Sequence, residues 1–195
     1  VTASIVDFRR WSASVSGEPF PSATAGGIAD DLASFVPAGL FADFVLPYWE
    51  QLYDGVTTGK RNAHVEDLRQ AQLPFLERVG LSFFDPSISH RLNPPMLRDC
   101  TRVPFGWRLG SFHYRGMDEQ AVRDFVFQAA ADGASSVFTI IEATLANATG
   151  QRLIAAFRRA GEDVAALLAG GASRAEVGRA VTPAGRQRFW AHFPE

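Results

Sequence analysis

The feature that most constrains the fold is a repeated pairing of a short apolar segment with a stretch of helical spacing. Such apolar segments lie at 23–28, 63–66, 81–84, 103–109 and 136–141. They lack the alternation of apolar and polar residues that marks a strand with one wet face, so we expect helices to cover both faces. A chain that alternates strand and helix in this way is predicted to be an α/β protein with a parallel sheet.

Proline, glycine and capping residues set the expected ends of the helices. Pro37 opens a helix in which Pro47 predicts a kink or a division into two pieces. Gly80 is the expected left-handed stop of a helix that begins near Leu68. Asp118 is the expected cap of a helix that ends near Gly133. Further helices are expected over 1–15, from Asn93 on, over 147–168, after the capping box at Ser173, and from Pro183 to about Trp190.

The composition excludes several classes of protein. The chain has 195 residues, of which 47% are hydrophobic and 21% charged, with a formal net charge of −2. It has no apolar run of the length that a membrane span needs, and it lacks the basic excess of a nucleic-acid binder. A single cysteine, Cys100, favours a reducing, cytoplasmic setting. We therefore expect one α/β domain over 1–195 that acts on a small molecule, with neither nucleic acid nor membrane as a partner.

Polar side chains gather where the expected strands end. His64 and Glu66 lie two positions apart, so on a strand both would project from the same face, roughly 7 Å from each other. Asp85 and Glu142 end two later segments, and Asp30 with Asp31 follows the first. In parallel α/β folds, functional sites lie at the carboxyl ends of the strands. These six residues are therefore candidates for a metal or acid–base site.

Some of these residues also have plain structural interpretations. Asp85 precedes Pro86, a setting typical of a turn residue that caps Ser87 or Ile88. Trp107 and Arg108 are expected to divide between the core and the strand end, where an arginine could hold a carboxylate or phosphate on a substrate.

The order of these segments resembles the uroporphyrinogen decarboxylase superfamily, which includes cobalamin-independent methionine synthase and corrinoid-dependent methyltransferases. The resemblance covers residues 23–168. It rests on the paired aspartates and the following helix in GIADDLASFVPAGLFADFVLPYWEQLYD, and on GKRNAHVEDL, LERVGLSFFDP, VPFGWRLGSF and AVRDFVFQAAADG. The fold that it implies is a (β/α)8 TIM barrel, of which this chain would supply the last five βα units.

The methyltransferase branch of that superfamily implies a metal site. Its zinc is held by a His-x-Cys pair and a distal cysteine, with an acidic ligand between them in some members. Here His64 matches the histidine, Glu66 replaces the first cysteine, Glu142 stands at the distal position and Asp85 is the intermediate acid. A histidine with carboxylates suits a harder ion or a zinc that carries water, rather than thiol activation.

The resemblance implies a metal-dependent, methyltransferase-like enzyme that uses a divalent ion such as zinc, with a corrinoid protein as a candidate partner. Asp30 or Asp31 would hold the substrate or move a proton as the catalytic group, and Trp107 and Arg108 would bind it. Two alternatives stay open: a metal-free decarboxylase-like lyase, and a non-catalytic half-barrel subunit. Because five strands of a barrel leave two open edges, we expect a homo-oligomer or association with a missing N-terminal half.

Overall fold

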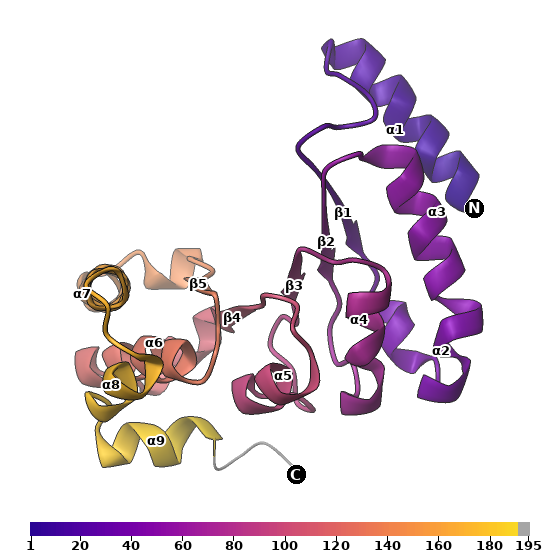
Figure 1. Cartoon of the computed structure of the whole chain (residues 1–195). Helices are drawn as coiled ribbons and strands as arrows, with labels where there is room; N and C mark the ends of the chain where they lie inside the picture. The colour runs from indigo at the N-terminus through magenta and orange to yellow at the C-terminus, as the bar shows by residue number, and fades with distance from the viewer. Residues whose placement is uncertain (191–195) are drawn as a thin grey trace. The chain divides into compact units, whose positions relative to one another are not determined.

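The computed structural model describes the backbone of residues 1–190 and the side chains of residues 1–186 (Figure 1). The chain divides into two compact units. The first unit holds Val1–Ser89 and Cys100–Pro104, and the second holds His90–Asp99 and the chain from Phe105 onward. Both units contain helices and parallel strands, so the predicted α/β class is confirmed.

The first unit is built on a three-stranded parallel sheet in the order β1-β2-β3. Its strands are β1 (Ala25–Ala29), β2 (Lys60–His64) and β3 (Phe83–Asp85). Its helices are α1 (Thr2–Ser16), the 3-10 turn η1 (Asp31–Phe35), α2 (Ala38–Phe44), α3 (Leu46–Val56), η2 (Gln70–Gln72) and α4 (Pro74–Arg78). Helices α1 and α3 run side by side (Figure 1).

The helices of this unit follow the local sequence. Pro47 lies in the first turn of α3, where its missing N–H costs nothing, and the expected helix is divided at Val45 as predicted. Gly80 adopts φ 70°, the left-handed stop that its position predicted. The aromatic core is formed where Phe41 packs edge-on against Trp49 and stacks on Phe75. Trp49 of this core also donates to Asp30, which directly follows β1.

The second unit contains a two-stranded parallel sheet formed by β4 (Gly106–Leu109) and β5 (Ser136–Thr139). Its helices are α5 (Pro94–Cys100), η3 (Ser111–Gly116), α6 (Glu119–Ala131), η4 (Ala143–Leu145), α7 (Ala148–Ala169), α8 (Arg174–Arg179) and α9 (Pro183–Trp190). Asp118 caps α6 and Ser173 forms a capping box with Glu176, both as the sequence predicted.

One expectation about the strands is corrected. The segment 136–141 was expected to be a buried strand, yet β5 ends at Thr139, and Ile140 and Ile141 are 45% and 60% exposed. The described strands form one sheet of three and one sheet of two, and they do not close into a barrel. An apolar run indicates strand propensity, whereas the burial of each face depends on partners distant in sequence.

Within the described residues, no helix is long and apolar enough to cross a membrane.

Candidate metal centre at the strand ends

The central pair of the site is His64 and Asp85, which the sheet register brings side by side. His64 ends β2 and Asp85 ends β3, and the two are direct partners across the strands. The Nδ1 atom of His64 lies 2.8 Å from Oδ2 of Asp85. Because a carboxylate can only accept, the imidazole Nδ1–H is the donor, and the neutral ring then carries its free lone pair on Nε2.

Asp85 is itself held in place on its other side. The backbone N–H of Ser87 donates to Asp85 Oδ1 at 2.8 Å, which is the turn that the sequence Asp-Pro predicted. Asp85 thus occupies the predicted turn with one carboxylate oxygen and contacts the His64 ring with the other. This arrangement fixes the orientation of the His64 ring.

Two more carboxylates lie on the lone-pair side of that ring. Asp31 Oδ1 is 3.8 Å and Glu66 Oε1 is 3.9 Å from His64 Nε2. The backbone N–H of Glu66 donates to Asp31 Oδ1 at 3.0 Å, and the Ser87 hydroxyl donates to Glu66 Oε1 at 2.6 Å. The ligand-capable atoms of Asp31, His64 and Glu66 all lie within 4.8 Å of one another. This set is called the Asp31–His64–Glu66 group below.

The backbone around the group adopts an uncommon conformation. Asp67 and Ser87 both have positive φ values, 55° and 58°. Such left-handed conformations are costly for residues other than glycine and gather at functional sites. At Ser87 this conformation accompanies two hydrogen bonds to the site, one to Asp85 and one to Glu66. Ser87 is therefore a site residue that the sequence pattern identified only as a turn position.

The donor set fits a divalent ion. Two ligands about 2.0–2.2 Å from a tetrahedral zinc lie roughly 3.3 Å from each other, so the two separations from His64 Nε2 exceed the bound one by only about half an ångström. Asp31 and Glu66 are half-exposed, with room to close this gap by small rotations. Three protein ligands leave an ion with an open position, which is the arrangement of catalytic rather than structural sites.

The metal set predicted from the sequence is changed by this geometry. Asp85 contacts Nδ1 of His64 instead of facing the lone pair on Nε2, and it is outside the Asp31–His64–Glu66 group. Asp31, predicted as a catalytic group, takes its place in the group. Glu66 lies two residues beyond the end of β2, so it reaches the ring from a turn and not from the same strand face.

The neighbouring aspartates Asp30 and Asp31 have separate roles. Asp30 accepts hydrogen bonds from the Trp49 indole N–H at 2.8 Å and from the backbone N–H of Ala33 at 3.2 Å. It therefore caps η1 and anchors the aromatic core, and both of its oxygens are occupied. The proposed catalytic role of Asp30 has no geometric support, whereas Asp31 points into the Asp31–His64–Glu66 group.

The other predicted site residues belong to the second unit. Trp107 is buried in its core, and the guanidinium of Arg108 lies over the Phe138 ring with 5.2 Å between carbon and centroid. Glu142 is exposed, three residues past the end of β5, where it precedes η4. Among the described residues, Glu142 is not part of a metal-capable group of three.

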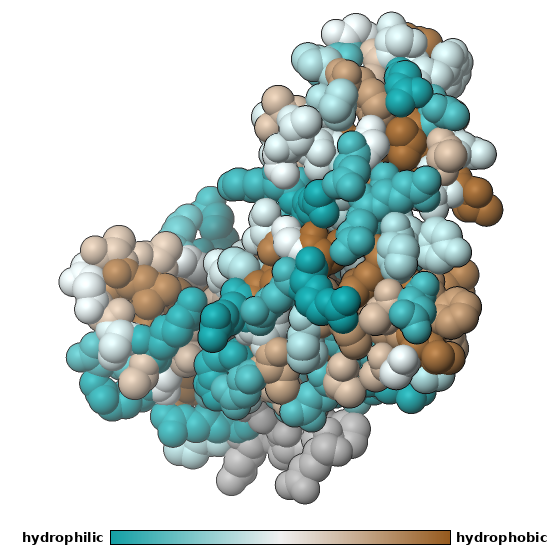
Figure 2. Space-filling model, turned by 45° about the vertical axis from the view of Figure 1, so that its right-hand side comes forward, coloured by the Kyte–Doolittle hydropathy of each residue, from teal (hydrophilic) through white to brown (hydrophobic). Residues whose placement is uncertain are grey.

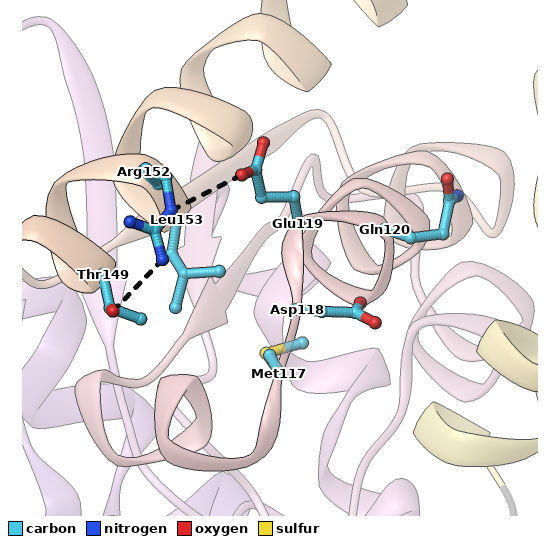
Figure 3. A pocket seen from close by; sticks show the side chains of 7 residues that line it. All are labelled: Met117, Asp118, Glu119, Gln120, Thr149, Arg152 and Leu153. Carbon is cyan, nitrogen blue, oxygen red and sulfur yellow. Dashed lines mark hydrogen bonds and ion pairs between the residues drawn. The ribbon is translucent and has the colours of Figure 1, made fainter.

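The second unit has a pocket of its own, of about 450 Å³, between the first turns of α6 and α7 (Figure 3). Asp118 and Glu119 are its acidic side chains, and ion pairs join Glu119 to Arg152 at 3.9 Å and to Arg159 at 3.1 Å. Arg152 also donates to the Thr149 hydroxyl at 3.2 Å. These charges compensate one another, so the pocket lacks the convergent ligand atoms of the first unit.

Cys100 lies apart from the metal-capable group. It ends α5 and its sulfur accepts a hydrogen bond from the Gln70 amide at 3.1 Å. The group therefore offers one imidazole nitrogen and carboxylate oxygens, without a thiolate.

Comparison of the chain with protein-family models and with curated proteins found no match.

Proposed function

We propose that this chain is a metal-dependent enzyme domain whose divalent ion is bound by Asp31, His64 and Glu66. The observation that carries the proposal is the Asp85–His64 pair: a carboxylate on Nδ1 leaves Nε2 as a preoriented ligand atom facing two carboxylates. Metal-ligating histidines in proteins commonly donate their other N–H to a carboxylate in this way.

Each residue then has a defined task. Asp85 and Ser87 position the ligands, Asp85 through Nδ1 of His64 and Ser87 through Oε1 of Glu66. A bound divalent ion would supply Lewis acidity, or a water activated as a nucleophile. Asp31 keeps a second oxygen that can bind substrate or accept a proton, since its side-chain contacts within the described residues involve Oδ1 only.

The assignment to the uroporphyrinogen decarboxylase and methionine synthase superfamily is part of this proposal. It is supported by the order of the segments and by a parallel sheet whose carboxyl end carries the candidate ligands. In that proposal the strands described above are the last five of a TIM barrel. The absence of a thiolate from the group favours a small oxygen-containing substrate over the thiol acceptor of the methyltransferases.

Zinc titration against a chromophoric chelator tests the proposal. We expect the wild-type chain to bind about one equivalent of Zn²⁺, and His64→Ala and Asp31→Asn to lose most of that affinity. Asp43→Asn is the matched control, because Asp43 is exposed on α2 in the same unit and outside the group. If the wild-type chain binds no stoichiometric zinc, or if His64→Ala binds it as tightly as Asp43→Asn does, the proposal is wrong.

A further inference from the structure

A hollow of about 450 Å³ lies on the sheet of the first unit, beside the proposed metal centre. Its floor is formed by alternate residues of the three strands, which share one face of the sheet. These residues are Gly27 and Ala29 of β1, Asn62 and His64 of β2, and Phe83 and Asp85 of β3. Ile28 of β1 and Ala63 of β2 also line the hollow, whereas Phe84 of β3 is fully buried.

One cation reaches this hollow from a different element. Arg9 lies on α1, which packs through Val6 against Leu52 and Val56 of α3. Positions three apart share a side of a helix, so the contact at Val6 turns Arg9 toward β1. There the Arg9 guanidinium donates to the Gly27 carbonyl at 3.4 Å. Glycine and alanine at positions 27 and 29 leave open space beneath it.

The charge of Arg9 is not compensated within the described part of the chain, where no carboxylate lies within ion-pair distance of it. The next residue, Arg10, is by contrast paired with Asp7 at 2.8 Å. A guanidinium has five N–H donors, and the bond to Gly27 is a long one. The side-chain amide of Asn62 lines the same hollow and also makes no hydrogen bond within the described residues.

We propose that this hollow binds a small bifunctional molecule with an anionic oxygen group, carboxylate or phosphate, on Arg9 and a polar end at the metal centre. Arginine matches both anions with two parallel hydrogen bonds. Gly27 and Ala29 are two residues apart, so the two ends of the hollow are separated by roughly 7 Å at the rise of a strand. Phe83 offers an apolar wall to the carbon skeleton between them. This inference names the substrate class of the proposed enzyme and rests on the proposed function.

Calorimetric titration of the zinc-loaded chain with succinate, and separately with inorganic phosphate, tests the inference and tells the two anions apart. We expect at least one of them to bind, and Arg9→Ala to weaken that binding about tenfold or more, as the loss of a charge-assisted hydrogen bond predicts. Arg9→Lys should recover only part of the loss, because lysine keeps the charge but cannot donate the two parallel hydrogen bonds of a guanidinium. Arg10→Ala is the matched control and should bind as the wild type does.

Zinc affinity, measured without anion, separates this inference from the proposed function. Arg9→Ala should bind zinc normally, since Arg9 contacts none of the proposed ligands. If zinc binds but neither anion does, or if Arg9→Ala binds the anion as well as Arg10→Ala, the inference is overturned and the metal centre stands. If an anion binds in an Arg9-dependent manner to a chain that takes up no zinc, the anion site stands and the metal centre is wrong.

Discussion

At the scale of single residues, two aspartates that the sequence pattern does not distinguish make different contacts with the same histidine ring. Asp85 ends strand β3 and Asp31 follows strand β1, but Asp85 contacts Nδ1 of His64 while Asp31 faces Nε2. The sequence predicted four of the residues that converge in the first unit, namely Asp31, His64, Glu66 and Asp85. It did not predict which of them would orient and which would bind, because that depends on ring orientation and on the register between strands.

Replacing Asp85 by Asn tests its orienting role. The amide can offer an N–H to the ring and so select the wrong tautomer, with the proton on Nε2. Changes to such outer contacts typically cost 10–100-fold in metal affinity, so we expect a loss of about that size in chelator competition. Loss of all binding would instead indicate that Asp85 is a direct ligand, and an unchanged affinity would show that the pair has no part in metal binding.

His113 gives the folded chain a pH dependence of its own. Burial lowers the pKa of His113, and its Nδ1 accepts a hydrogen bond from the Gly110 N–H at 3.2 Å. Below the ordinary histidine pKa of about 6.5, the unfolded chain therefore binds more protons than the folded one. Stability should fall as the pH decreases through this range.

The measurement is the difference in free energy of unfolding between the wild type and His113→Gln, obtained from urea titrations at several pH values. The difference should be constant above pH 7 and should shrink as the pH is lowered below about 6.5. A difference that is independent of pH, or that grows on acidification, would contradict the buried neutral state of His113.

At the scale of elements, local signals predicted the helices better than the strands. Asp118 and Ser173 cap the starts of helices and Gly80 marks the end of one, all as expected, since caps act through contacts within one turn. The expected helix over 68–79 is instead divided into η2 and α4, with Pro74 in the first turn of α4. Strand ends depend on pairing with distant segments, so β2 stops at His64 and leaves Glu66 on a turn.

The cap of α6 can be tested by Asp118→Ala. Asp118 accepts a hydrogen bond from the Ala121 N–H at 2.8 Å, and the loss of such a cap typically costs about 1 kcal/mol of unfolding free energy. Asp43→Ala serves as the comparison, since Asp43 is exposed within α2 and caps no helix. A loss no larger than that of Asp43→Ala in denaturant titration would contradict the assigned cap.

At the scale of the whole molecule, the described chain forms two compact units, each with its own parallel sheet. Hydropathy is unevenly spread over the surface, and brown apolar patches lie beside teal polar ones (Figure 2). On α1 the side chains of Ile5, Phe8, Trp11 and Val15 are exposed, although the sequence predicted only their helical spacing. The alternation of strand and helix segments predicted the α/β class. It could not predict how the strands divide between sheets, because that depends on contacts between segments distant in sequence.

Tryptophan accessibility tests this arrangement. Trp11 is 60% exposed, whereas Trp49 and Trp107 are 2% and 3% exposed, one in each unit. The Trp190→Phe variant removes a tryptophan whose side chain is outside the described set. In that variant, iodide should quench the fluorescence of Trp11 but not that of Trp49 or Trp107. The further substitution Trp11→Phe should therefore abolish the quenchable fluorescence. If a large quenchable fraction remains, at least one of the two cores is open to solvent.

X-ray absorption of the chain loaded with one equivalent of zinc would show whether His64 and two carboxylates form the proposed metal centre without sulfur. The spectrum should show nitrogen and oxygen ligands at about 2.0–2.2 Å, with the multiple scattering of a single imidazole that disappears in His64→Ala. A sulfur ligand near 2.3 Å, which only Cys100 or a methionine could supply, or an imidazole signal that persists in His64→Ala, would contradict the account.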